Sequence, residues 1–164
     1  MKEELFKNHI PLLKPWLGEE EWHALKDVIL SGWISQGPKC IEFEDALASY
    51  IGVNHVVVTN SCTSAMHLGL RIHNIGYGDE VILPNNTCMA NANAILMAHA
   101  TPVFCDIDET YNIDPNQIEQ WITPNTKSIM AVDQTGVPCD LDSLSSICQK
   151  HGLLLIDDAA VSLG

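Results

Sequence analysis

Positive charge is scarce in this sequence. The 164 residues hold 8 lysine and arginine residues against 21 aspartate and glutamate residues, which gives a formal net charge of -13 at pH 7. Lys14, Lys26, Arg71 and Lys127 are scattered along the chain and form no basic cluster. Since nucleic-acid binding depends on cations that neutralise phosphates, this composition argues against a nucleic-acid partner.

The sequence also lacks a hydrophobic run long enough to span a membrane. Its beginning, MKEELFKNHIPLLKPW, has neither the apolar core nor the small-residue cleavage site of a secretory signal. We therefore expect a cytoplasmic protein without a membrane partner. The hydrophobic content of 46% is enough for one sizeable core in a chain of this length.

Closely spaced metal or disulfide ligands are absent as well. The six cysteines include no CxxC pair, and the seven histidines show no HxxxH or HxH spacing. The apolar content can build a core without covalent staples, so we expect reduced thiols. A zinc site would need ligands from scattered places, and we expect no metal.

Two helix patterns open the chain, over residues 18–32 and 39–52, with the loop WISQGP between them. Each has acid in its early turns and ends on glycine, as the helix dipole and the C-cap favour. Residues 1 to about 40 are interpreted as an N-terminal arm that precedes the main domain.

After Gly52 the pattern changes to short β-rich runs that alternate with helical stretches. The runs cover residues 55–60, 80–84, 101–107, 128–134 and 153–158, and the helices begin near Cys62, Cys88, Asp114 and Asp140. This βαβ repetition predicts a mostly parallel sheet with helices on both faces, a three-layer α/β/α fold. Gly76-Tyr77-Gly78 precedes a strand instead of following one, so a dinucleotide-binding turn is not supported.

Open parallel sheets bind ligands outside the carboxyl ends of their strands, so the residues after each run are the candidates. Asn60 to Ser64 join a strand to a helix, where free N–H groups and hydroxyls suit a phosphate. Ordinary N-capping by Ser61 or Thr63 explains the same residues. Cys62 at this helix start is also a candidate nucleophile if its pKa is lowered.

Asp158 follows an uninterrupted apolar run, which indicates a strand buried on both faces. A carboxylate fixed at the tip of such a strand is costly unless a cationic group meets it, and a protonated heteroaromatic nitrogen would serve. A capping or loop-bracing aspartate is the alternative.

Six blocks in order resemble the DegT/DnrJ/EryC1/StrS family of pyridoxal-phosphate-dependent sugar aminotransferases. They are GWISQGPKCIEFEDALASYIG, VVVTNSCTSAMHLGL, GYGDEVILPNNTCMANANAI, TPVFCDIDETYNIDPNQIE, VDQTGVPCDLDSL and LLIDDAAVSLG. The resemblance runs from about Ile10 to Gly164. It implies the first part of a fold-type I large domain and pyridoxal 5'-phosphate as cofactor.

The resemblance also implies roles for single residues. Asp158 matches the aspartate that pairs with the pyridinium nitrogen, and Asp157 matches a structural acidic position. Thr63 and Ser64 match the phosphate-binding turn. Cys88 stands where many members place an aromatic ring against the cofactor.

Two further departures concern the cofactor pocket. Cys62 stands where many members have glycine, and Val161 where many have glutamine or histidine able to bond the phenolic oxygen. We expect the Cys62 side chain to crowd the phosphate loop and Cys88, which offers no stacking surface, to weaken the hold on the cofactor. The three departures together predict less efficient catalysis.

By this resemblance the chain is expected to end before the lysine that forms the Schiff base and before the small C-terminal domain. The seven lysines present stand outside the family's lysine context. The implied reaction moves an amino group from an amino acid donor to a nucleotide-linked keto-sugar, in a homodimer. Sugar dehydration on the same scaffold and an inactive truncated fragment are the alternatives.

Overall fold

The computed structural model describes residues 14–163. The earlier part of the predicted arm, with Lys2 and Lys7, lies outside these residues, as does Gly164. The chain divides into two compact units, Met1–Val56 and Val57–Gly164. Each unit is described by itself.

The first unit contains two helices, α1 (Glu19–Ser31) and α2 (Pro38–Ile51), which confirms both helices expected from the sequence. The Gly18 N–H donates to the Glu21 carboxylate at 2.6 Å, and Pro38 begins α2 at a position where its missing N–H costs nothing. No residue of either helix is buried within the described chain. Apolar side chains such as Trp22 and Phe43 are therefore exposed.

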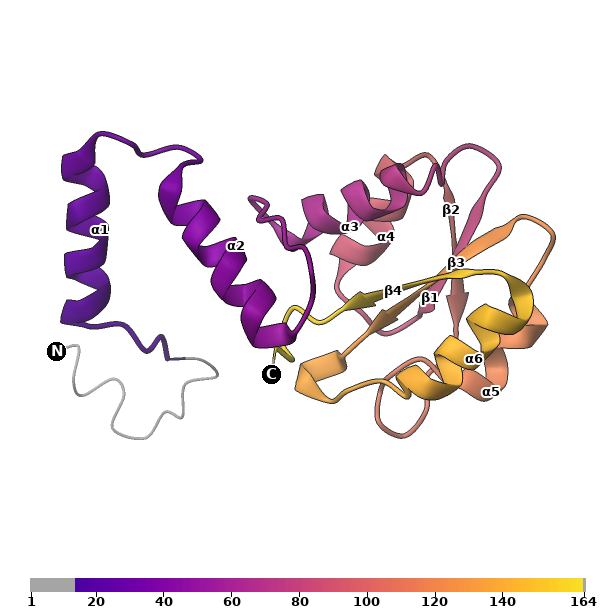
Figure 1. Ribbon diagram of the computed structural model, residues 1–164. Coiled ribbons are helices and arrows are strands. Elements are labelled where there is room, and N and C mark those ends of the chain that lie inside the picture. Colours follow the sequence, from indigo (N-terminus) through magenta and orange to yellow (C-terminus); the bar gives the residue numbers. More distant parts are fainter. Residues whose placement is uncertain (1–13, 164) are drawn as a thin grey trace, which may run out of the picture. The chain divides into compact units, whose positions relative to one another are not determined.

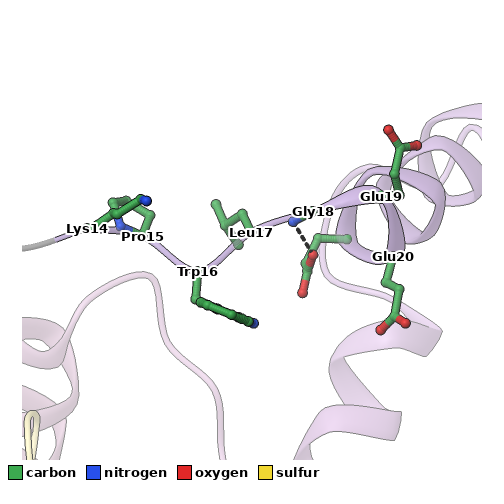
Figure 2. Close-up of a pocket in the computed structure, with 8 residues that line it drawn as sticks. Lys14, Pro15, Trp16, Leu17, Gly18, Glu19 and Glu20 are labelled. Carbon is green, nitrogen blue, oxygen red and sulfur yellow. Dashed lines mark hydrogen bonds between the residues drawn. The ribbon is translucent and has the colours of Figure 1, made fainter. Parts of the chain in front are cut away.

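A shallow hollow of about 440 Å³ lies at the start of the first unit, along Lys14 to Glu21. Figure 2 shows that consecutive residues form it, with the Gly18–Glu21 hydrogen bond at the entry to α1. The indole of Trp16 stands clear of the chain in this view and is 97% exposed. Among the described residues, no side chain from a distant part of the sequence lines this hollow.

The second unit is built on a four-stranded sheet in the order β2-β1-β3-β4, with every pairing parallel. The strands are β1 (Glu80–Pro84), β2 (Thr101–Cys105), β3 (Thr126–Val132) and β4 (Leu154–Asp158). Val132 of β3 is in register with Asp158 of β4, so both strands end at the same edge. The predicted parallel α/β sheet is confirmed.

Helices cover both faces of this sheet (Figure 1). On one face, α3 (Cys62–Ile72) and α4 (Met89–Met97) pack with Val81, Leu83 and Met130. On the other, α5 (Pro115–Ile118) and α6 (Leu141–His151) contribute to a second core with Ile82 and Ile129. Alternate residues of one strand thus feed opposite cores, because strand side chains alternate between faces.

Short 3₁₀ turns complete the second unit, η1 (Glu119–Trp121) and η2 (Gln134–Gly136). The second of these follows β3 directly, so it lies at the carboxyl edge of the sheet. Thr135 has φ 55°, a left-handed conformation that a β-branched residue seldom adopts.

The strand expected over 55–60 does not form. Its valines favour extended backbone, but a strand also needs a neighbour that completes the hydrogen-bond ladder. None of the four strands of the sheet formed by the described residues includes this segment, and the boundary between the two units falls within it.

Across residues 14–163, none of the helices combines the length and the apolar character that a bilayer crossing requires.

Candidate functional site

Asp158 is the last residue of β4 and is 8% exposed. Its Oδ2 accepts a hydrogen bond from Asn91 Nδ2 at 2.7 Å. Its Oδ1 accepts from the Ala160 N–H at 3.2 Å and from the Cys62 thiol at 3.3 Å. The strand expected to be buried on both faces is instead an edge strand of the described sheet, and its residues 154–156 are only half-buried. Its last residue is nevertheless a buried carboxylate that three different segments orient.

Asn91 is completely buried on α4, and the sequence analysis did not single it out. Its Oδ1 accepts from the Thr87 hydroxyl at 2.8 Å, and its Nδ2 also contacts Met66 Sδ at 3.2 Å. A signal was available, because Asn91 shares the buried side of α4 with Ala94 and Ile95. A polar residue on an apolar helix face needs a partner inside the protein.

The start of α3 carries the residues expected to bind phosphate. Ser61 is the N-cap and accepts from the Ser64 N–H at 3.2 Å, which is the capping arrangement that the alternative interpretation required. The two hydroxyls lie 3.0 Å apart. Thr63 and Ser64 are in the first turn, where backbone N–H groups have no acceptor within the helix.

Cys62 does not have the electrostatics of a nucleophile. Partial burial, followed by the hydrogen bond to Asp158, raises the pKa of its thiol to about 11. Burial, which is the larger cause, and the neighbouring carboxylate together move this pKa upward, opposite to the lowered pKa that the nucleophile hypothesis requires. At neutral pH the thiol is a hydrogen-bond donor.

A pocket of about 260 Å³ opens at the carboxyl edge of the sheet. Its walls come from the segments that follow three strands: Thr87 and Cys88, Asp133 to Thr135, and Asp158 with Ala160 and Val161. Cys88 is exposed and is the N-cap of α4. The structure thus brings Cys88, Asp158 and Val161 together, with Cys62 bonded to Asp158, while Thr63 and Ser64 lie on α3 outside the lining.

Two other aspartates stand near Asp158. Asp133 is 5% exposed and accepts from the Cys139 N–H at 2.8 Å and from the Ser162 hydroxyl at 2.6 Å. Burial, then the charges of Asp133 and Asp158, raise the pKa of Asp157 to about 6. Within residues 14–163 no ion pair compensates these carboxylates. The edge suits a small ligand with a cationic group facing Asp158 and an anionic group facing the start of α3.

Comparison with known proteins agrees with this site. Residues 15–164 match the model of the DegT/DnrJ/EryC1/StrS aminotransferase family. The spore coat polysaccharide biosynthesis protein SpsC of Bacillus subtilis (strain 168) is 44% identical over 156 residues, which are 94% of this chain and 40% of SpsC.

Solved structures show the same fold. The aminotransferase TlmJ from Streptoalloteichus hindustanus has a TM-score of 0.89 at 35% identity, over 94% of this chain and 43% of TlmJ. NtdA from Bacillus subtilis, solved with bound cofactor PMP, has a TM-score of 0.84 at 33% identity, over 93% of this chain and 38% of NtdA.

The chain spans less than half the length of each of these relatives. They are aminotransferases of fold type I, which confirms the predicted fold class. Pyridoxal phosphate, or its amino form PMP, is the cofactor of such enzymes. This chain belongs to the DegT/DnrJ/EryC1/StrS aminotransferase family.

Proposed function

We propose that the protein containing this chain is a pyridoxal-phosphate-dependent aminotransferase that moves an amino group from an amino acid to a nucleotide-linked keto-sugar. The observation that carries the proposal is the buried carboxylate of Asp158, which ends β4, is held by Asn91 and lines an open pocket. The relation to SpsC, named for polysaccharide biosynthesis, supports a sugar substrate.

The residues present fit the cofactor's two charged ends. Asp158 would accept a hydrogen bond from the ring nitrogen, and its low exposure would strengthen that bond. The first turn of α3, with Thr63 and Ser64, would bind the phosphate through N–H groups and hydroxyls. When bound, the protonated ring supplies a sink for the electrons released as a substrate C–H bond breaks.

Cys62 and Cys88 would lie beside the cofactor ring, at positions where many relatives have glycine and an aromatic residue. Cys88, exposed on the pocket wall, would fill space against one face but offers no aromatic surface for stacking. Cys62 would remain protonated beside Asp158. Val161 lines the pocket without a polar group to offer the phenolic oxygen.

Neither lysine of the second unit lines this pocket. Lys127 Nζ donates to the Pro124 carbonyl at 3.4 Å, and Lys150 Nζ to Glu119 at 2.7 Å. We therefore propose that the lysine of the reaction comes from residues beyond Gly164. We also propose that the full protein is a homodimer, as the family resemblance implies.

The experiment is to load the full protein with pyridoxal phosphate and to supply glutamate with a nucleotide-linked keto-sugar. Mass spectrometry of the nucleotide sugar should show replacement of the keto oxygen by an amino group. Loss of water without gain of nitrogen would indicate sugar dehydration instead. No change in the sugar, in protein shown spectroscopically to hold the cofactor, would contradict the proposal.

A further inference from the structure

Asn91 is fully enclosed, and its side chain is bonded directly to Asp158 of the candidate site. Burying an amide is costly unless its donor and acceptor groups both find partners. The Asn91 amide meets this condition with polar partners on both sides, Thr87 and Asp158. A leucine would fill the same position of α4 without that requirement, so the site, and not the core, explains the amide.

The carboxylate of Asp158 sets the direction of the Asn91 amide, and the Thr87 hydroxyl adds a donor that matches it. The Thr87 hydroxyl donates to Asn91 Oδ1 at 2.8 Å, and Asn91 Nδ2 then donates to Asp158 Oδ2 at 2.7 Å. Reversing the amide would place its oxygen against a carboxylate oxygen, with no proton between them. The three side chains therefore form a directed chain of hydrogen bonds that ends on Asp158.

This chain of bonds treats the two oxygens of Asp158 differently. Oδ2 accepts a hydrogen bond from the buried Asn91 amide, while Oδ1 accepts longer hydrogen bonds from the Cys62 thiol and the Ala160 N–H. The carboxylate thus has one anchored oxygen and one oxygen presented toward the segments that border the pocket. An amide N–H can only donate, and donation to a carboxylate stabilises its charged form.

We propose that Asn91 is a positioning residue: it fixes Asp158 through Oδ2 so that Oδ1 meets the ring nitrogen of the cofactor and keeps that nitrogen protonated. This inference rests on the proposed function. Thr87 acts one step further out, by donating to the amide oxygen. These roles of Asn91 and Thr87 can be distinguished from simple packing in the core, because substituting either residue should change the protonation of the bound ring.

Other titratable groups lie near the Asp158 carboxylate or line the same pocket, and the test must leave these residues unchanged. They are Cys62 at the start of α3, Cys88 at the start of α4, Asp133 after β3 and Asp157 beside Asp158 on β4. None of them is altered by substitutions at Asn91 or Thr87. A change in the titration of the ring nitrogen in those variants therefore comes from the chain of hydrogen bonds.

The test compares the full protein with its Asn91→Leu and Thr87→Val variants, using pyridoxamine 5'-phosphate labelled with ¹⁵N in the ring. Two quantities are measured: the dissociation constant, and the pH at which the ring-nitrogen chemical shift reports loss of the proton. Asn125→Leu is the matched control, because Asn125 is exposed and precedes β3 at the opposite edge of the sheet.

For Asn91→Leu we expect a dissociation constant raised about tenfold and a ring-nitrogen midpoint lowered by about one pH unit. Thr87→Val should raise the dissociation constant and lower the ring-nitrogen midpoint by smaller amounts. If Asn91→Leu does not fold, the result for Thr87→Val tests the inference by itself. Asn125→Leu should match the unaltered protein. Unchanged nitrogen midpoints in the folded variants, even with lower thermal stability, would overturn the inference.

Failure of the unaltered protein to bind the cofactor would overturn the proposed function and this inference together. Binding by the unaltered protein with no effect of either variant would overturn this inference alone.

Discussion

At the scale of single residues, two adjacent aspartates at the end of β4 have different surroundings. Asp158 is buried and bonded by Asn91 and Cys62. The Asp157 side chain reaches the surface, and its pKa is raised by partial desolvation and by the charges of Asp133 and Asp158. The alternation of side chains along a strand sends neighbours to opposite faces. Only one of the pair therefore belongs to the site.

The first prediction compares these aspartates in the full protein. Asp158→Asn should lower the amino-transfer rate by orders of magnitude, because a neutral amide no longer holds the ring nitrogen protonated. Asp157→Asn should change the rate little. Steady-state kinetics of the two variants measure this, and equal losses would show that the wrong carboxylate has been assigned.

The second prediction concerns pH and Asp157. Its pKa of about 6 lies above the ordinary value near 4, so folding favours the protonated form. The stability that this contributes is full below about pH 4 and is lost as the pH rises through 6. Asp157→Asn should therefore raise the free energy of unfolding above pH 6, by no more than about 1 kcal/mol given the exposure of the side chain.

Thermal unfolding of the two proteins at a series of pH values checks this. The curves should coincide near pH 4 and separate toward pH 7. A constant difference at every pH would contradict the assigned cause.

At the scale of elements, sequence reasoning located most of the sheet. The strands β1 to β4 form where apolar runs were found. Only β1 and β3 are central and mostly buried, whereas β2 and β4 lie at the edges of the described sheet and are partly exposed. The run at 55–60 is also rich in valine but forms no strand in the structure, and composition alone does not report which runs enter a sheet.

Part of the candidate site could also be predicted from the sequence. Asp158 and Cys88 could be named because they follow strands, and family resemblance supplied their roles. Asn91 could not be paired with Asp158 in advance, since 67 positions separate them and only the packing of α4 brings them together. The raised pKa of Cys62 follows from burial and then from a second long-range contact, its hydrogen bond to Asp158.

The third prediction tests the elements directly by hydrogen exchange of this chain. Amides of β3, which is paired on both sides, should exchange far more slowly than those of residues 55–60. Mass spectrometry of peptides from the two segments measures the difference. Equal protection would show that the segment 55–60 is part of a stable sheet after all.

At the scale of the whole molecule, no lysine is among the described residues that line the proposed cofactor pocket. The fourth prediction is that the chain of 164 residues, mixed with pyridoxal phosphate and reduced with borohydride, is labelled sparsely over several lysines. An imine requires an amine within bonding distance of the aldehyde carbon. Stoichiometric labelling of one of these lysines, with amino-transfer turnover, would contradict the proposed source of the lysine.

The most direct measurement is a crystal structure of the full protein grown with pyridoxamine 5'-phosphate. The account predicts the ring nitrogen about 2.8 Å from an oxygen of Asp158, with Asn91 still bonded to the other oxygen and the phosphate at the first turn of α3. A ring nitrogen that faces a different residue, or a phosphate bound away from α3, would contradict it.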